Sequence, residues 1–298
     1  MKIFEKLRID KSNLKIVELG EWFFVPLEFR NKYNLNIQTF GNLVSHELVE
    51  ATELEGNAEV NKITVKNKSD NYLVLHDGEI IVGAKQNRTI DKSIILNSNE
   101  LKNVDVLCVE KGRWNYTSSE FSQHNTKLSP EIRYSKESTN QQNKQNAVWH
   151  EIDNIYHNSD QFSQSSDFCE FKEENNEVFL NTIKSKIFNN QYNGLFVKGP
   201  QVCFLEIFYD ANIYEDQITK SIKSFLINKN KKNYQKVNIE DYLKILKNSE
   251  WNKEFTNSAG QPFVINDKVK GRLIFLKGQL VHLILYFHNK LNFGDTYD

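Results

Sequence analysis

A series of short strand-like segments in the first 117 residues most constrains the fold of this chain. The segments are rich in β-branched and aromatic residues, and they are Lys62–Asn67, Tyr72–His76, Glu79–Gly83, Thr89–Leu96 and Asn103–Glu110. Polar turn residues separate them, and none of the intervening stretches has helical periodicity. Strands that follow one another roughly every 8 to 15 residues without helices are typical of an antiparallel sandwich or barrel. We therefore predict an antiparallel β-sandwich over residues 1–117.

Two local signals refine this prediction. Leu14–Leu27 reads as strand material that is broken at Gly20. Asp77-Gly78 predicts a tight hairpin, because a type I′ turn needs positive φ at both central residues. We therefore expect the strands before and after Asp77-Gly78 to pair with each other.

The composition changes after residue 117, and the second half mixes helices with strands. Residues 118–146 are rich in Ser, Gln, Asn and Lys, which favours a polar surface connection. Apolar residues at helical spacing predict helices at Ala147–Tyr156, Glu173–Phe188, Ile213–Leu226 and Asn238–Leu246. Two hairpins are expected, one in Gly194–Tyr209 and one formed by Lys270–Leu276 and Gln279–Phe287. The expected fold class is mixed β and α+β, with an α+β domain over residues 147–298.

Charge and cysteine content narrow the functional classes. The chain has 298 residues and a formal net charge of -1, so it lacks the basic field of a nucleic-acid binder and we do not expect nucleic acid as a partner. Cys108, Cys169 and Cys203 are too few and too widely spaced for a disulfide framework or a CxxC metal site. The histidines lack metal-ligand spacing, and His282 reads as a core histidine, so no metal is predicted. The absence of a signal peptide and of a long apolar run predicts a cytoplasmic protein without a membrane partner.

Charged residues interrupt the strand pattern between residues 79 and 114. Glu79 and Glu110 each continue an apolar strand face, and a carboxylate in such a place must be paired, hydrogen-bonded or protonated. The cations that follow closely in the sequence are Lys85, Arg88 and Arg113. This density of charge marks the stretch as the candidate site.

Two interpretations of these charges stay open. In the first, the cations and the amides of Gln86 and Asn87 bind phosphate, and Trp114 stacks on a base. Glu79 and Glu110 are then the candidate catalytic carboxylates. In the second, the same charges form an internal salt-bridge network that binds no ligand.

Two sequence motifs in this stretch resemble a known family. They are GEIIVGAKQNR at Gly78–Arg88 and CVEKGRW at Cys108–Trp114. They are similar to the ARG and rhodanese-phosphatase-superfamily-associated protein domain, in which ARG stands for ADP-ribosylglycohydrolase. Weaker similarity extends over roughly Val17–Phe287. The family is named for its gene neighbours, so the resemblance implies a setting of ADP-ribose, NAD or nucleotide processing without naming a reaction or a cofactor.

The expected function is therefore the binding, with or without processing, of a phosphorylated small molecule of the nucleotide type, related to ADP-ribose or NAD. The alternative is a non-enzymatic protein-interaction module whose charged motif is structural and whose partner is another protein.

Overall fold

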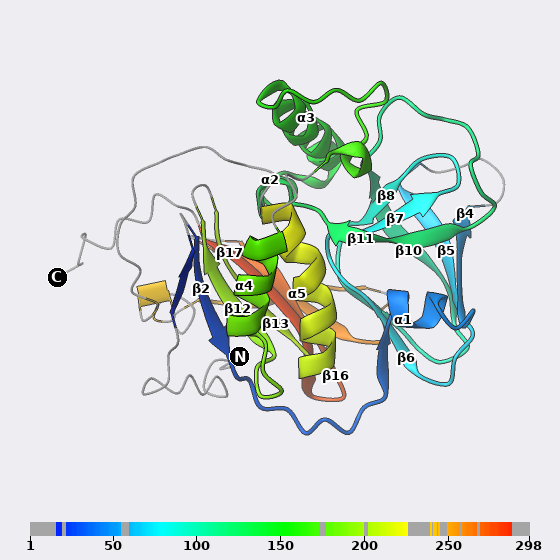
Figure 1. Ribbon diagram of the computed structural model, residues 1–298. Coiled ribbons are helices and arrows are strands. Elements are labelled where there is room, and N and C mark those ends of the chain that lie inside the picture. The colour runs from blue at the N-terminus through cyan, green and yellow to red at the C-terminus, as the bar shows by residue number, and fades with distance from the viewer. Residues whose placement is uncertain are drawn as a thin grey trace.

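The computed structural model describes residues 16–19, 22–54, 60–172, 177–199, 202–225, 239, 241, 242, 244, 249–256, 258–266 and 269–287. An eight-stranded antiparallel sheet forms one side of the molecule (Figure 1). Its strands are, in spatial order, β1 (Val17–Leu19), β2 (Trp22–Leu27), β12 (Gly194–Lys198), β13 (Cys203–Phe208), β17 (Gln279–Phe287), β16 (Val269–Leu276), β15 (Gln261–Asn266) and β14 (Asn252–Lys253).

Two smaller sheets form the other side of the molecule. The six-stranded sheet has the order β11 (Phe121–Lys127), β7 (Glu79–Gly83), β8 (Arg88–Ile90), β10 (Leu101–Cys108), β5 (Lys62–Asn67) and β4 (Val49–Glu53). The three-stranded sheet has the order β3 (Ile37–Thr39), β6 (Tyr72–Leu75) and β9 (Ile94–Leu96). Alternate residues of these strands point inward, so that Ile63, Leu73 and Val104 share one apolar core.

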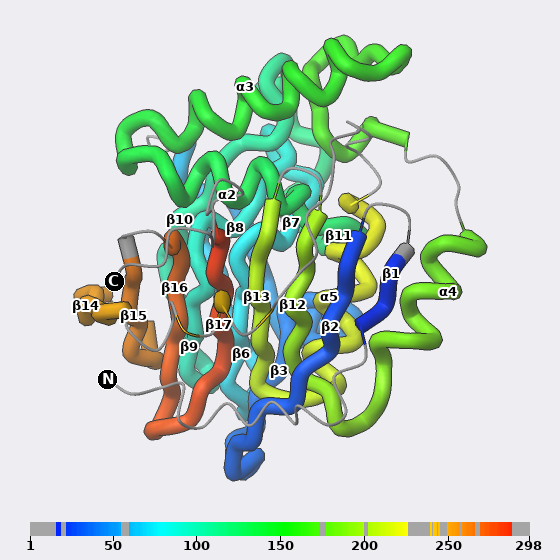
Figure 2. The backbone as a smooth tube through the Cα atoms, turned by 90° about the vertical axis from the view of Figure 1, so that its left-hand side faces the viewer, coloured from blue at the N-terminus to red at the C-terminus, as the bar shows by residue number. Residues whose placement is uncertain are grey.

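Among the described residues, four helices cover the large sheet and one end of the molecule, and a fifth, short helix packs against the two small sheets. They are α1 (Phe40–Val44), α2 (Pro130–Ser138), α3 (Lys144–His157), α4 (Glu177–Ile187) and α5 (Ala211–Phe225), with 3₁₀ turns η3 (Gln141–Asn143) and η4 (Phe168–Glu170). α4 and α5 lie against one face of the large sheet, and α2 and α3 lie across its end (Figures 1 and 2). Phe24, Phe204 and Phe225 form the aromatic centre of the core under α5. Each helix among the described residues is too short or too polar to cross a bilayer.

The predicted mixture of antiparallel sheets and helices is confirmed. Most of the strands over residues 62–108, the helices that became α3, α4 and α5, and both C-terminal hairpins lie close to their predicted positions. The predicted single strand Thr89–Leu96 is wrong, because the chain breaks between Ile90 and Ile94 and its two ends, β8 and β9, belong to different sheets. The predicted helix Asn238–Leu246 lies mostly outside the described residues.

The sandwich-then-α+β order needs a correction. β2 pairs with β12 in the register Phe24↔Val197, and β1 pairs with β2. The first strands of the chain therefore complete the sheet of its second half. Local alternation predicts that a segment is a strand, but it does not encode which distant strand is its partner.

The prediction of a polar surface connection over residues 118–146 is also wrong. This segment contains β11 and α2, and α3 begins within it. Several of its cations are buried, among them Lys127, Arg133 and Lys136, whereas many of its Ser, Asn and Gln residues are exposed. A polar composition normally indicates a solvated segment, and here the charges instead face other charges inside the molecule.

The chain does turn at Asp77-Gly78, but not as a hairpin. β6 pairs with β3 and β9, whereas β7 pairs with β8 and β11, so the turn carries the chain from one sheet to another. Only Gly78 has a positive φ, of 77°. A type I′ turn would need positive φ at both positions.

Candidate functional site

The two sequence motifs lie side by side in the six-stranded sheet. β7 and β8 form a hairpin whose turn contains Lys85, Gln86 and Asn87. β8 pairs with the end of β10, where Cys108 lies opposite Arg88. Gly83 has a φ of 118°, and an added Cβ would lie 2.3 Å from Ser118 Oγ. Only glycine fits this position without strain, which accounts for the glycine at this point of the motif.

Glu110 and Arg113 hold the turn of this hairpin. Arg113 Nε donates to Glu110 Oε1 and Oε2 at 2.8 and 2.9 Å, and Arg113 Nη1 donates to the carbonyl of Ala84 at 2.8 Å. The Asn87 backbone N–H donates to Glu110 Oε2 at 3.1 Å, and Arg113 Nη2 donates to Asn87 Oδ1 at 3.2 Å. The predicted pairing of Glu110 with a nearby cation is confirmed, and the pair fixes loop geometry.

Arg88 is fully buried below this loop. Its Nη2 lies 3.5 Å from Glu53 Oε1, and its Nη1 donates to Cys108 Sγ and to Gln86 Oε1. Glu53 is the last residue of β4. The sequence does not reveal that it pairs with Arg88, because the two residues are 35 positions apart. The guanidinium is thus enclosed by protein groups and does not reach the surface.

Asp167 is the second carboxylate that the sequence analysis missed. Asn87 Nδ2 donates to Asp167 Oδ2 at 2.8 Å, and the Cys169 N–H donates to Oδ1 at 3.0 Å. Burial raises the pKa of Asp167 to about 6, and the nearby Glu110 charge adds to the rise. The sequence around Asp167 indicates only a local role, because this residue caps the 3₁₀ turn η4 that follows it.

Lys85, unlike Arg88, remains partly exposed at the surface. Lys85 Nζ lies 5.3 Å from the centroid of the Trp114 ring and 5.2 Å from that of Tyr116. Trp114 is 45% exposed and Tyr116 is 61% exposed. In the described part of the chain, Lys85 Nζ has no carboxylate within ion-pair distance. We call Lys85, Trp114 and Tyr116 the aromatic rim.

Glu79 lies apart from this cluster, and within the described part of the chain it shares no hydrogen-bond partner with Glu110. Its Oε2 accepts the His76 N–H at 2.7 Å, and its Oε1 accepts from Gln123 Nε2 at 3.0 Å and Gln217 Nε2 at 2.7 Å. Gln217 belongs to α5, so Glu79 joins the small sheets to the helix layer of the large one. The two candidate catalytic carboxylates therefore do not converge.

A network of buried charges lies between the two sides of the molecule. Glu206 on β13 accepts from Arg133 Nη2 at 2.8 Å and from Lys127 Nζ at 3.3 Å. Lys136 Nζ lies 3.2 Å from Asp77 Oδ1 and 3.5 Å from Asp91 Oδ1. Burial opposes ionisation, but Arg133 and Lys127 nevertheless hold the pKa of Glu206 well below its ordinary value.

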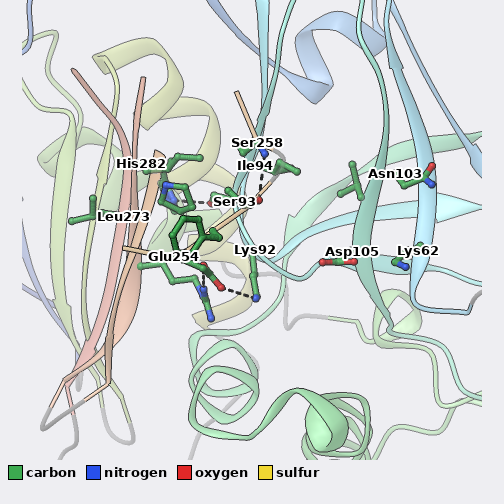
Figure 3. A pocket seen from close by; sticks show the side chains of 16 residues that line it. Lys62, Lys92, Ser93, Ile94, Asn103, Asp105, Glu254, Ser258, Leu273 and His282 are labelled. Atoms are coloured by element: carbon green, nitrogen blue, oxygen red, sulfur yellow. Dashed lines mark hydrogen bonds and ion pairs between the residues drawn. The ribbon is translucent and has the colours of Figure 1, made fainter. Parts of the chain in front are cut away.

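A pocket of about 370 Å³ opens beside this network, between β16 and β17 on one side and β9 and β10 on the other. Lys92 and Arg272 line it, and both pair with Glu254. Ser93 and His282 also line it, and their side chains point toward one another (Figure 3). His282 is buried, as the sequence predicted, but it borders a cavity.

The described residues contain no group of three or more His, Cys, Asp or Glu side chains placed to hold a metal ion. All three cysteines are free thiols. No curated protein and no solved structure matches the chain significantly. A family model for the ARG and Rhodanese-Phosphatase-superfamily-associated Protein domain matches residues 13–286, which include both motifs and both sides of the molecule. The chain therefore belongs to the ARG and Rhodanese-Phosphatase-superfamily-associated Protein domain family.

Proposed function

We propose that the chain binds a phosphorylated nucleotide-type ligand, related to ADP-ribose or NAD, at the aromatic rim. The observation that carries this proposal is the position of Lys85, whose ammonium lies between two exposed aromatic rings. An ammonium of this kind attracts phosphate, and an exposed indole provides a flat surface on which a base can stack. The family association with ADP-ribose metabolism supports this ligand class.

The remaining motif residues would act by shaping the rim. Arg113 and Glu110 hold the loop that carries Trp114, and Asn87 ties that loop to Asp167. The guanidinium carbon of Arg88 lies 5.7 Å from the Trp114 ring centroid, so this buried cation would help to hold the indole in position. Any processing of the ligand at the rim would use Glu110 or Asp167, because Glu79 lies elsewhere. Asp167 suits the role of a general acid, since its pKa of about 6 is close to neutrality.

Thermal shift measurements with ADP-ribose, NAD and AMP test the proposal. A ligand with a Kd of ~1 μM, present at ~100 μM, should stabilise the folded protein by about 2.7 kcal/mol. Lys85→Ala and Trp114→Ala should each remove this stabilisation while leaving the unliganded melting temperature nearly unchanged, because both side chains are partly exposed.

Lys111→Ala is the matched control. Lys111 also lies over a tryptophan, 5.8 Å from the Trp149 ring centroid, but it pairs with Asp153 at 3.5 Å. This variant should keep the full ligand shift. If none of the three compounds stabilises the wild-type protein, the nucleotide proposal is wrong.

A second candidate function is a protein-interaction module with a structural motif. The observation that favours it is the internal pairing of Arg88, Glu110 and Arg113. In this reading, Glu110→Ala leaves Arg113 without its carboxylate and destabilises the fold by several kcal/mol, and nucleotides have no effect. A Glu110→Ala variant that melts like the wild type would contradict it.

A further inference from the structure

Three side chains form a hydrogen-bonded line from the pocket into the buried charge network. Ser93 Oγ lies 2.8 Å from His282 Nδ1, and His282 Nε2 lies 3.1 Å from Glu206 Oε1. Ser93 precedes β9, whereas His282 is on β17 and Glu206 on β13. The line therefore joins the small sheets to the large one, and its serine end faces the cavity (Figure 3).

The charge state of Glu206 fixes the proton positions along this line. Glu206 is ionised, because Arg133 and Lys127 stabilise its carboxylate against burial, so it can only accept hydrogen bonds. His282 Nε2 must therefore carry the proton and donate it to Glu206. Nδ1 then presents its lone pair, and the Ser93 hydroxyl donates to it. This arrangement sets a neutral imidazole base against a serine hydroxyl.

The turn at the start of the family motif also reaches Ser93. The Asp77 N–H donates to Ser93 Oγ at 2.9 Å, and the preceding residue, His76, is held through its own N–H by Glu79. Gly78 follows with a φ of 77°, and an added Cβ there would lie 2.7 Å from Arg133 Cδ. Gly78 and Glu79 thus fix the turn that aims a backbone donor at the serine oxygen. This hydrogen bond holds the serine oxygen in place, so that its hydroxyl proton can point to His282 Nδ1.

We propose that Ser93 is a nucleophile for a carboxylic ester bound in this pocket, with His282 as its base and Glu206 as a positioning residue. Ser93 Oγ would attack the ester carbonyl carbon while its proton moves to His282 Nδ1. The alcohol leaves with that proton, and an acyl group remains on Ser93. Water then attacks the acyl group, His282 again takes and returns the proton, and the carboxylic acid leaves.

The pocket favours an acyl over a phosphoryl substrate. Phosphoryl transfer depends on cations that neutralise the oxygens of the transferred group. The cations that line the pocket are Lys62, Lys92 and Arg272. Lys92 and Arg272, which lie on the His282 side (Figure 3), are already paired with Glu254, and Arg272 is also paired with Glu137. An ester carbonyl needs less positive charge, because only one oxygen becomes anionic.

Covalent labelling of the full chain with a fluorophosphonate, which reacts with activated serines, tests the proposal. We expect one adduct, mapped to Ser93 by peptide mass spectrometry, and slow hydrolysis of p-nitrophenyl acetate. Ser93→Ala should abolish both signals, and His282→Gln should slow labelling by at least about 100-fold, the scale of general-base catalysis. Ser258→Ala, which changes another serine of the same pocket, should leave labelling intact.

Two further measurements cover the case in which His282→Gln fails to fold. The thiol introduced by Ser93→Cys should react with iodoacetamide faster than Cys108, Cys169 and Cys203, because burial raises the pKa of each native thiol. Glu206→Gln should move the labelling pH profile, since its amide no longer fixes the histidine tautomer. Absence of labelling at Ser93 in the folded wild type would overturn the proposal, as would an unreactive thiol in the Ser93→Cys variant.

Discussion

At the scale of single residues, two buried histidines link the pocket to the motif. The ring centroids of His76 and His282 lie 5.0 Å apart in an edge-on contact. Burial lowers the pKa of both, and the Lys127 charge adds to the effect, while Glu206 opposes it. Both rings are therefore neutral at pH 7. A neutral His282 ring can accept a proton as a base. The His76 ring must be neutral to be buried in the folded protein.

This neutrality predicts acid sensitivity of the fold. A histidine whose folded pKa lies below its unfolded value of about 6.5 contributes stability above that pH and loses it as the pH falls, because only the unfolded chain then gains the proton. The melting temperature should fall between pH 7.5 and pH 5. For each such histidine, the free energy of unfolding falls by at most about 1.4 kcal/mol per pH unit below pH 6.5. Asp167 has the opposite effect. Because burial raises its pKa, the folded protein takes up this proton at a higher pH than the unfolded chain does, which stabilises the fold as the pH falls.

His76→Phe isolates the contribution of one ring. Neither ring nitrogen of His76 has a hydrogen-bond partner among the described residues, and the ring packs edge-on against Phe208, so phenylalanine keeps the contacts. The variant should lose less stability than the wild type over the same pH range. Equal pH slopes for the two proteins would show that His76 is not buried neutral.

At the scale of elements, α2 shows how a buried helix can have a polar sequence. Ser129 caps it and accepts the Ile132 N–H, Pro130 occupies its first turn, and Glu131 lies near its positive end. These start signals are present in the sequence. The helix was nevertheless missed, because its buried face carries Arg133 and Lys136 where an apolar stripe is normally expected.

Arg133 should be among the most sensitive positions in α2. Arg133→Met removes a cation that pairs with Glu206 and Asp77, and leaves these buried carboxylates with only Lys127 and Lys136 as cationic partners. The expected loss in the free energy of unfolding is about 3–5 kcal/mol. Chemical denaturation measures it, with the exposed Ser138→Ala in the same helix as a control that should stay within about 0.5 kcal/mol.

A double-mutant cycle separates the pair from general damage to the helix. Arg133→Met combined with Glu206→Gln should be less destabilising than the sum of the two single changes, with a coupling of about 0.5–3 kcal/mol. Strict additivity would mean that the two side chains do not interact.

At the scale of the whole molecule, the sequence predicts elements well and their long-range partners poorly. The strands around both motifs follow from alternation, and the Glu110–Arg113 pair follows from their spacing of three residues. The partners of Arg88 and Glu79 could not be inferred, because Glu53 and Gln217 come from strands or helices far along the chain. Ser93 carried no sequence signal, since its role depends on β17 folding back 189 positions later.

The charge network also determines whether the molecule can be divided into independently folding domains. Its residues come from all three predicted segments: Asp77 and Asp91 from residues 1–117, Lys127 and Arg133 from 118–146, and Glu206 from 147–298. A cut at either predicted boundary leaves buried charges unpaired on both sides and removes β2 from the edge of β12. Neither half can then satisfy its own polar groups.

We therefore expect one cooperative unit. Fragment 1–117 and fragment 118–298 should each lack a melting transition when produced alone, and the intact chain should unfold in a single calorimetric transition whose enthalpy equals the van't Hoff value. A folded fragment 1–117, seen as dispersed amide signals in an NMR spectrum, would contradict this, as would two transitions in the intact chain. Either result would mean that the small sheets are stable without the large one. The buried charges would then form only after two independent domains dock, and their pairing would contribute to docking and not to the stability of each domain.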